Sequence, residues 1–202
     1  MTSKSDATRA RLLDAATEEF AAHGLAGARV DRIAAAASAN KNLIYVYFGN
    51  KEALFDSVFS RAVDTYLAAV DFDPEDLPGY AGALFDFFMT RPHLMRLSRW
   101  HSLERPGEQR RLPLLAATAR DKRAALAEAQ RKGAVEPALA APHLWEMVLS
   151  LAATWAPGSP DPLTKDTDPQ EIAARRHALV VAVGLLSRPG AERRRSAGPE
   201  AS

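Results

Sequence analysis

The chain has 202 residues, of which 47% are hydrophobic, and its formal net charge is only +1. A chain of this length forms one or two domains with a substantial core. It contains no cysteine, which excludes disulfides, thiolate metal sites and cysteine nucleophiles. No apolar run reaches the roughly 18 residues of a membrane span, and the N-terminus lacks the apolar core of a signal peptide. These features predict a cytoplasmic protein without membrane contact.

The first segment of the chain is predicted to be a helix over residues Thr8–His23. Its apolar side chains Leu12, Ala16 and Phe20 recur at helical spacing, and Gly24 stands where a C-terminal cap belongs. The preceding residues 1–6 are polar, and we expect them to be frayed.

The segment Val30–Glu52 is predicted to form two short helices joined by a tight turn. Its apolar residues recur at helical spacing on both sides of residues 38–40, which break the pattern. Asn40 is expected to cap the second short helix, and Asn50 the longer helix that starts at Lys51. This arrangement is typical of a helix-turn-helix, whose second helix can enter a DNA major groove.

The rest of the chain is predicted to be helical as well, with no strand alternation and no repeat. A long amphipathic helix starts at Lys51 and is followed by a largely buried one. A helix that starts at Pro92 is expected to turn Leu94, Leu97, Trp100 and Leu103 inward. The predicted ranges are 51–70, 77–89, 92–103, 114–132, 143–155 and 169–186, with a charged loop over 104–111. Residues 188–202 are polar and predicted to be disordered; within them, Arg193, Arg194 and Arg195 are read as a solvated run, with contact to DNA as the second interpretation.

Specific residues then point to a family. The run Leu43-Ile44-Tyr45-x-Tyr47-Phe48-x-Asn50-Lys51-Glu52-Ala53-Leu54 resembles the signature of the tetracycline-repressor (TetR) family of transcriptional regulators. The upstream residues Arg11–Ala16, Phe20, Gly24, Val30, Asp31, Ile33 and Ala34 resemble it too. This resemblance covers roughly the first quarter of the chain. It implies an all-α fold in which a three-helix DNA-binding domain (residues 1–50) joins a ligand-binding and dimerisation bundle (residues 51–187).

The resemblance implies double-stranded DNA as a partner, contacted mainly by the second short helix. The first 55 residues hold seven Lys or Arg and six Asp or Glu, so the interpretation rests on the motif and not on a basic field. Lys41 and Asn42 have the chemistry to read bases, and Leu43 that to touch a thymine methyl group. Tyr45 and Lys51 would hold phosphates. Four further candidates are Arg29, Asn40, Val46 and Tyr47. Arg29 either contacts a phosphate or is solvated, and base contact is the second role of Asn40 after capping. Tyr47 either holds a phosphate or packs on the first helix.

A small-molecule effector, mostly apolar, is the second partner that the resemblance implies. Large apolar groups beside isolated polar ones suggest its contacts, although core packing is the alternative for each. The candidates are Phe59, Tyr66, Phe88, Trp100, His101, Thr118 and Met147. The five histidines show no metal-ligand spacing, and no nucleophile elbow or phosphate-binding glycine loop occurs. We therefore expect no enzyme activity, cofactor or metal.

The last two long helices look too apolar for exposed surface helices. In the final one, Ile172, Leu179, Val183 and Leu186 form one stripe, and a second contains Val181, Ala182 and Leu185, with Gly184 allowing close approach. This pattern predicts a four-helix interface between two copies, and hence a homodimer on a palindromic site. A repressor is the family habit, although an activator would have the same sequence features. The alternative is a helical protein-interaction adaptor without DNA binding.

Overall fold

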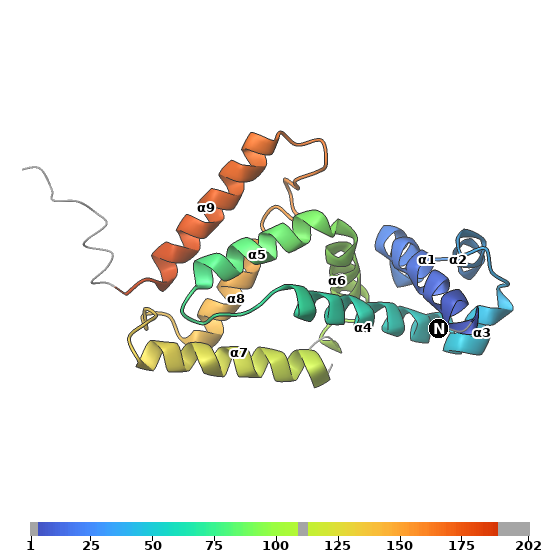
Figure 1. The fold of residues 1–202 in the computed structure, drawn as a ribbon, viewed down its shortest axis with the longest axis horizontal. Coiled ribbons are helices and arrows are strands. Elements are labelled where there is room, and N and C mark those ends of the chain that lie inside the picture. The colour runs from blue at the N-terminus through green and yellow to red at the C-terminus, as the bar shows by residue number, and fades with distance from the viewer. Residues whose placement is uncertain (1–3, 109–112, 190–202) are drawn as a thin grey trace, which may run out of the picture. The chain divides into compact units, whose positions relative to one another are not determined.

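The computed structural model describes residues 4–108 and 113–189, and every regular element within those ranges is an α-helix (Figure 1). The prediction of an all-α chain with an N-terminal helix-turn-helix is confirmed. The helices are α1 (Lys4–Gly27), α2 (Val30–Ala36), α3 (Asn42–Phe48), α4 (Lys51–Ala69), α5 (Leu77–Thr90), α6 (Pro92–Glu104), α7 (Pro113–Arg131), α8 (Ala141–Ala152) and α9 (Pro169–Ser187).

The helices form two compact units that interleave along the sequence. The first comprises residues 1–68 and 91–112, and the second residues 69–90 and 113–202. The first unit therefore holds α1 to α4 together with α6, and the second holds α5, α7, α8 and α9. The functional boundary at residue 50 remains a prediction, because compactness does not define where a DNA-binding function ends.

The core of the first unit is built from the apolar stripes that the sequence indicates. Leu12, Ala16 and Phe20 on α1 are fully buried, and they pack with Ile33, Ile44 and Phe55 of α2, α3 and α4. Phe20 meets Phe55 edge to face, with ring centroids 5.0 Å apart. Burial of this many large apolar side chains is the dominant stabilisation of α2 and α3, which have seven residues each and are too short to persist alone in water.

Helix α1 is longer at both ends than the predicted range. It begins at Lys4, so the expectation that residues 1–6 are frayed is wrong for residues 4–6. It also continues past Gly24, although Gly24 has φ +68° and ψ −175° and interrupts the helical backbone. Gly24 therefore marks a break within α1 and is not its last cap.

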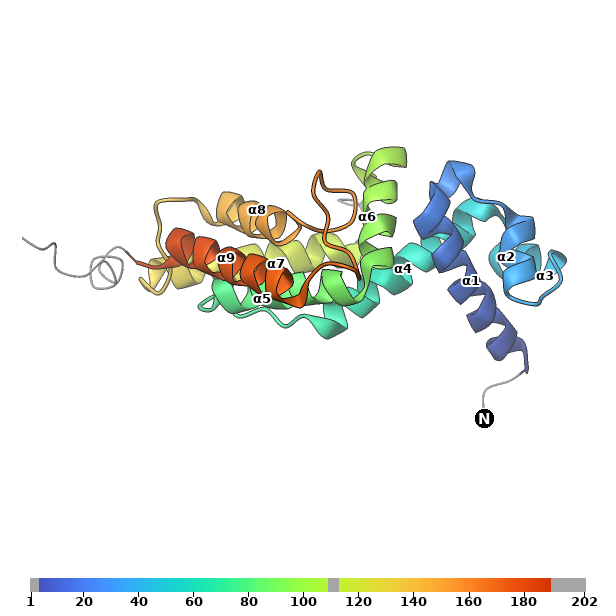
Figure 2. The ribbon, with the colours of Figure 1, turned by 90° about the horizontal axis from the view of Figure 1, so that it is seen from above.

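In the second unit, α5 packs against both α8 and α9, and α8 also packs against α7 (Figure 2). Helix α5 is buried over most of its circumference, as predicted, with Leu77, Ala81, Leu84 and Phe85 among its buried residues. It is tied to α9 by Asp86, which accepts hydrogen bonds from Arg176 at 2.8–3.0 Å.

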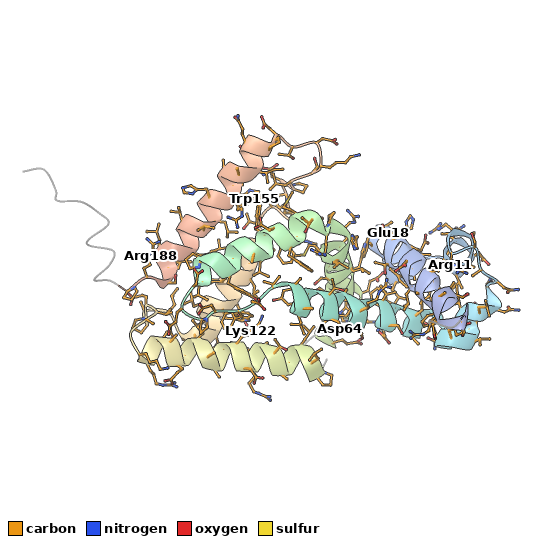
Figure 3. The ribbon with its side chains drawn as sticks, in the orientation of Figure 1. Arg11, Glu18, Asp64, Lys122, Trp155 and Arg188 are labelled. Carbon is orange, nitrogen blue, oxygen red and sulfur yellow. The ribbon has the colours of Figure 1, made fainter. Side chains whose placement is uncertain are left out.

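An aromatic cluster surrounds one lysine of the second unit. The Lys122 ammonium lies 5.4, 5.0 and 5.6 Å from the ring centroids of Phe72, Tyr80 and Trp145. Burial lowers the pKa of Lys122, and Asp71 opposes that shift. The three rings attract the ammonium of Lys122, which is labelled in Figure 3, through their negative faces, and this offsets part of its lost hydration.

Three further details differ from the sequence-based expectations. Leu103 is 73% exposed and does not point inward, because it lies about 120° around α6 from the fully buried Leu97. Helix α8 begins two residues earlier and ends three residues earlier than predicted. The predicted disorder of the C-terminal tail and the run Arg193 to Arg195 fall almost entirely outside the described residues.

Candidate nucleic-acid interface

The turn between α2 and α3 is fixed by side-chain caps. Asn40 Oδ1 accepts a hydrogen bond from the Asn42 amide at 2.8 Å, which satisfies a donor at the start of α3. Asn50 Oδ1 accepts from the Ala53 amide at 2.7 Å and caps α4 in the same way. The predicted capping roles of both asparagines are confirmed. Ser38 adopts φ +49° in the turn, where a short polar residue is better tolerated than a branched one.

The start of α2 is capped by a residue from another helix. Arg29 provides no side-chain cap, but its amide donates to Glu19 Oε1 of α1 at 2.8 Å. Arg32 Nη2 lies 2.6 Å from the same oxygen. Burial raises the pKa of Glu19, yet the hydrogen bonds from Arg32 and the Arg29 amide outweigh it, and the pKa ends below its ordinary value. A carboxylate therefore persists here at neutral pH and fixes α2 to α1.

The outer face of α3 is exposed and chemically mixed. Ile44 and Phe48 are buried and hold the helix on the core, whereas Tyr45 is 45% and Val46 73% exposed. Lys41 and Asn42 are also exposed, at the start of the helix. This face offers an ammonium, an amide, a phenol and a methyl-bearing side chain, which are groups that can contact base edges and phosphates in a major groove.

Other predicted contact residues already have partners within the first unit. Lys41 Nζ lies 2.8 Å from Asp31 Oδ1, and this ion pair raises the pKa of Lys41. Lys51 Nζ donates to the Ala28 carbonyl at 3.4 Å. The Tyr47 hydroxyl lies 3.0 Å from Ser5 Oγ on α1, which favours packing over phosphate contact among its two predicted roles. Leu43 is half-buried against the core.

Two side chains, Arg11 and Glu104, secure α1 through contacts that the sequence did not predict. Arg11 Nε donates to the Ala37 carbonyl at the end of α2, at 3.2 Å. Glu104 of α6 accepts from the Leu25 amide at 2.6 Å and from the Ala26 amide at 2.9 Å, beyond the break in α1. An interrupted helix leaves amides without helical partners, so a glycine within a helical pattern is the signal that could have predicted a cap from elsewhere.

Trp100, one of the predicted effector contacts, also connects α6 to α1. Its indole Nε1 donates to the Ala21 carbonyl at 3.3 Å. Of the other candidates in the first unit, Phe59 and His101 stack with ring centroids 4.0 Å apart, both almost fully buried, and Tyr66 is half-buried on α4. In the second unit, Phe88 and Thr118 are half-buried and Met147 is 40% exposed. The effector contacts remain predictions.

Comparison with known proteins identifies the family. Residues 12–58 match the family model for bacterial regulatory proteins of the tetR family, and residues 76–184 match the tetracyclin repressor-like C-terminal domain. The chain belongs to the TetR family. Members of this family are DNA-binding transcriptional regulators, so the exposed α3 face belongs to a helix-turn-helix of the DNA-binding kind.

Individual relatives agree with this assignment. The HTH-type transcriptional repressor SCO4008 from Streptomyces coelicolor is 41% identical over 75% of this chain and 79% of its own length. The HTH-type transcriptional repressor NicS from Pseudomonas putida is 28% identical over 73% of this chain and 75% of its own. The structure of Streptomyces coelicolor SCO4942, described as a transcriptional regulator, is 41% identical with a TM-score of 0.76, covering 90% of this chain and 99% of that one.

Two features are absent from the part of the chain that the structure describes. No helix in those ranges is long and apolar enough to cross a bilayer. The same residues contain no cluster of three or more His, Asp or Glu side chains that could hold a metal ion.

Proposed function

We propose that this TetR-family regulator is a ligand-responsive repressor that acts in the cytoplasm as a homodimer on a palindromic operator. The observation that carries the proposal is the exposed outer face of α3, whose start is capped by Asn40 and which presents Lys41, Asn42 and Tyr45. The names of SCO4008 and NicS support repression rather than activation.

Within this proposal, the residues of the interface have separate roles. Lys41 and Asn42 read base edges, while Leu43 and Val46 contact thymine methyl groups. Tyr45, Lys51 and Arg29 hold the phosphate backbone. Lys41 exchanges Asp31 for DNA on binding, so the ion pair with Asp31 orients its side chain in the free protein.

The test compares specific and non-specific DNA binding. Asn42→Ala should weaken operator binding by about 1–3 kcal/mol at one position of each half-site and leave random DNA unaffected. Lys51→Ala should weaken both and reduce the slope of log affinity against log salt by about one. Lys132→Ala, which removes an exposed cation at the end of α7, is the matched control. Equal losses on operator and random DNA for Asn42→Ala would contradict base reading.

The dimer is proposed to form through α8 and α9. Val181 is 45% and Leu185 57% exposed on α9, beside Met147 on α8, whereas Leu179 and Val183 are buried within the chain. Leu179 and Val183 of the first predicted stripe face the interior of the chain, whereas Leu186 of that stripe is half-buried and lines an open hollow together with Ala182 and Leu185 of the second. Gly184 departs from the prediction, because it is buried and faces Pro78 of α5. The exposed stripe also borders an open hollow lined by both helices, including Ala182 and Leu151.

One substitution separates the dimer from a monomer. Ala182→Glu should leave the chain folded but monomeric in sedimentation experiments, because it places a charge in an apolar interface, and operator binding should be lost. Ala173→Glu, on the exposed opposite side of α9, should remain dimeric. A wild-type protein that sediments as a monomer at micromolar concentration would overturn this part of the proposal.

The effector is proposed to be a mostly apolar molecule that changes the preferred separation of the two DNA-binding domains in the dimer. Tryptophan fluorescence should find ligands that also release operator DNA. Because coupling between two sites is reciprocal, operator DNA must lower the affinity of the protein for the same ligands by the same factor. Ligands that bind but never alter DNA affinity would contradict the coupling.

A further inference from the structure

The ion pair between Lys41 and Asp31 lies on the face that is proposed to meet DNA. Asp31 stands in the first turn of α2, and Lys41 directly precedes α3. Their charged atoms are 2.8 Å apart, and the side chains of Lys41 and Asp31 are 45% and 74% exposed. A base-reading residue of the free protein is therefore already held by a carboxylate, and DNA has to compete with that carboxylate for it.

Asp31 differs from the other carboxylate that pairs with a cation of α2. Glu19 holds Arg32, but it also caps α2 through the Arg29 amide, and its side chain is only 10% exposed. Asp31 is mostly exposed, and within the residues that the structure describes its partner is Lys41. A first-turn carboxylate and an exposed ion pair each contribute little to folding. Stability alone therefore does not account for the carboxylate beside Lys41.

The pair changes what Lys41 contributes to the binding of any DNA. A free lysine that neutralises one phosphate releases about 0.9 counterion, and this release makes the affinity depend on salt. A lysine that a carboxylate has already neutralised releases far less, and the carboxylate itself repels nearby phosphates. On a sequence that offers Lys41 only phosphates, it would exchange one anion for another, so the pair with Asp31 stays closed.

A matching base changes this balance. Guanine presents two acceptors, O6 and N7, to a lysine in the major groove, and such a contact separates the right base from a wrong one by about 5- to 150-fold. An exposed ion pair resists its own exchange by about five-fold or less. Lys41 therefore leaves Asp31 where the base is right and stays with it elsewhere.

We propose that Asp31 is a specificity-determining residue, which withholds Lys41 from the phosphates of non-specific DNA and releases it to a base of the operator. The inference rests on the proposed reading of bases by Lys41. It predicts a property that a merely structural carboxylate would not have, because removal of Asp31 should strengthen binding to the wrong DNA. Both residues belong to the same compact unit, so their exchange of partners needs no change in the second unit.

Salt titrations of DNA binding by the full chain test this role. The probes are an operator duplex, selected by the wild-type protein from a random pool, and a shuffled duplex of the same length. Asp31→Asn should bind the shuffled duplex about three-fold or more tightly, and the slope of log affinity against log salt should steepen by about one for each DNA-binding domain engaged. Operator affinity should rise less, so the ratio of the two affinities falls. Asp31→Glu keeps the carboxylate and should retain the wild-type ratio.

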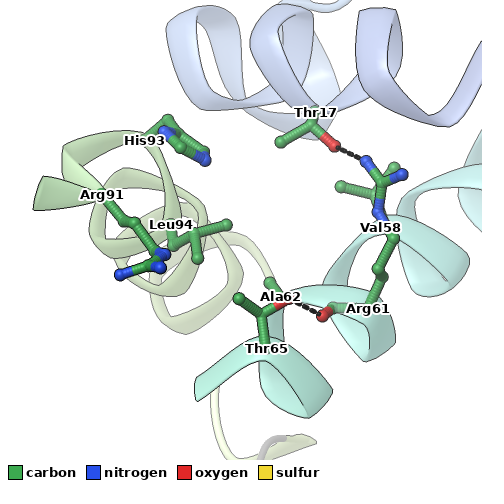
Figure 4. A pocket seen from close by; sticks show the side chains of 8 residues that line it. All are labelled: Thr17, Val58, Arg61, Ala62, Thr65, Arg91, His93 and Leu94. Atoms are coloured by element: carbon green, nitrogen blue, oxygen red, sulfur yellow. Dashed lines mark hydrogen bonds between the residues drawn. The ribbon is translucent and has the colours of Figure 1, made fainter. Parts of the chain in front are cut away.

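A second ion pair of the same unit provides the matched control. Asp14 and Arg61 are also 2.8 Å apart, their side chains are 71% and 39% exposed, and Arg61 donates to Thr17 Oγ1 at 2.8 Å (Figure 4). Arg61 lies ten residues beyond the start of α4, roughly 15 Å along that helix, which exceeds the Debye length of about 10 Å in 0.1 M salt. Asp14→Asn makes the same change in charge and should leave the slope unchanged on both duplexes.

The double variant of Asp31→Asn with Lys41→Gln shows whether Asp31 acts through Lys41. Its slope on the shuffled duplex should return to the wild-type value, and a slope that stays steep would overturn the inference. An unchanged slope of Asp31→Asn, an equal rise in affinity on both duplexes, or an equal effect of Asp14→Asn would overturn it as well. Circular dichroism checks that each variant is folded, and Asp31→Ser takes the place of Asp31→Asn if the latter is not.

The same titrations separate this inference from the proposed function. A wild-type protein that selects no operator and binds neither duplex would contradict the proposed function, and this inference with it. Wild-type binding to the operator together with an unaltered Asp31→Asn variant would overturn the role of Asp31 alone.

Discussion

Replacing Gly24 with alanine is the sharpest test of the junction between α1 and α6. The glycine adopts φ +68° and ψ −175°, a region open almost only to glycine, and forcing another residue into it costs about 1–3 kcal/mol. A Cβ at this position would also lie 2.8 Å from the Trp100 ring and 2.9 Å from Glu104 Oε1. Overpacking of this kind adds about 1–3 kcal/mol. We therefore expect Gly24→Ala to lower the free energy of unfolding by about 2–6 kcal/mol, a large share of typical domain stability.

Urea denaturation followed by circular dichroism measures this loss, and the same helix offers a control. Gly27 has no positive φ, and its Cβ would meet only His23 Cβ, at 3.4 Å. Gly27→Ala should be neutral or stabilising by up to about 1 kcal/mol. A double-mutant cycle of Gly24→Ala with Trp100→Leu should recover the part of the steric cost that comes from the Trp100 ring, but not the backbone part. Equal unfolding midpoints for the two alanine variants would refute the reasoning.

Three further outcomes follow from single contacts. The free energy of unfolding should fall as the pH drops below about 6.5. Burial, and after it the charge of Arg105, lowers the pKa of His101 in the folded protein, while in the unfolded chain His101 protonates at its ordinary pKa. Urea titrations at pH 7 and pH 5 should show a smaller loss of stability on acidification for His101→Phe than for the wild type. Lys122→Met should cost about 1 kcal/mol in the same assay, because three cation–π contacts are lost while the cost of burying a charge is removed. Asp86→Asn should cost only about 0.5–1 kcal/mol, since the ion pair with Arg176 is about half exposed; a larger loss that persists in 1 M salt would contradict screening.

The sequence was sufficient for the elements that depend on local pattern. The stripe through Leu12, Ala16 and Phe20 and the caps at Asn40 and Asn50 are decided by residues within one turn of each other, so periodicity and cap chemistry predict them. The Glu19 cap of α2 was not predicted, because its partner amide at Arg29 lies ten residues away across a chain reversal. Such contacts depend on tertiary packing.

The candidate interface shows the same division. The exposed and buried faces of α3 follow from helical spacing, but the partners of Lys41, Lys51 and Tyr47 do not.

We expect the contacts around α1 to carry a displacement of α4 or α6 to α3. α4 begins three residues after α3 ends, so any rotation of α4 acts on α3 directly. α6 is connected to α2 through α1. Glu104 of α6 accepts hydrogen bonds from the amides of Leu25 and Ala26 in α1, and Glu19 of α1 accepts one from the amide of Arg29 at the start of α2. Both links join carboxylates to backbone amides, which are short, directional and charge-assisted. We therefore expect a displacement of α6 to shift the backbone of the helix-turn-helix through these hydrogen bonds.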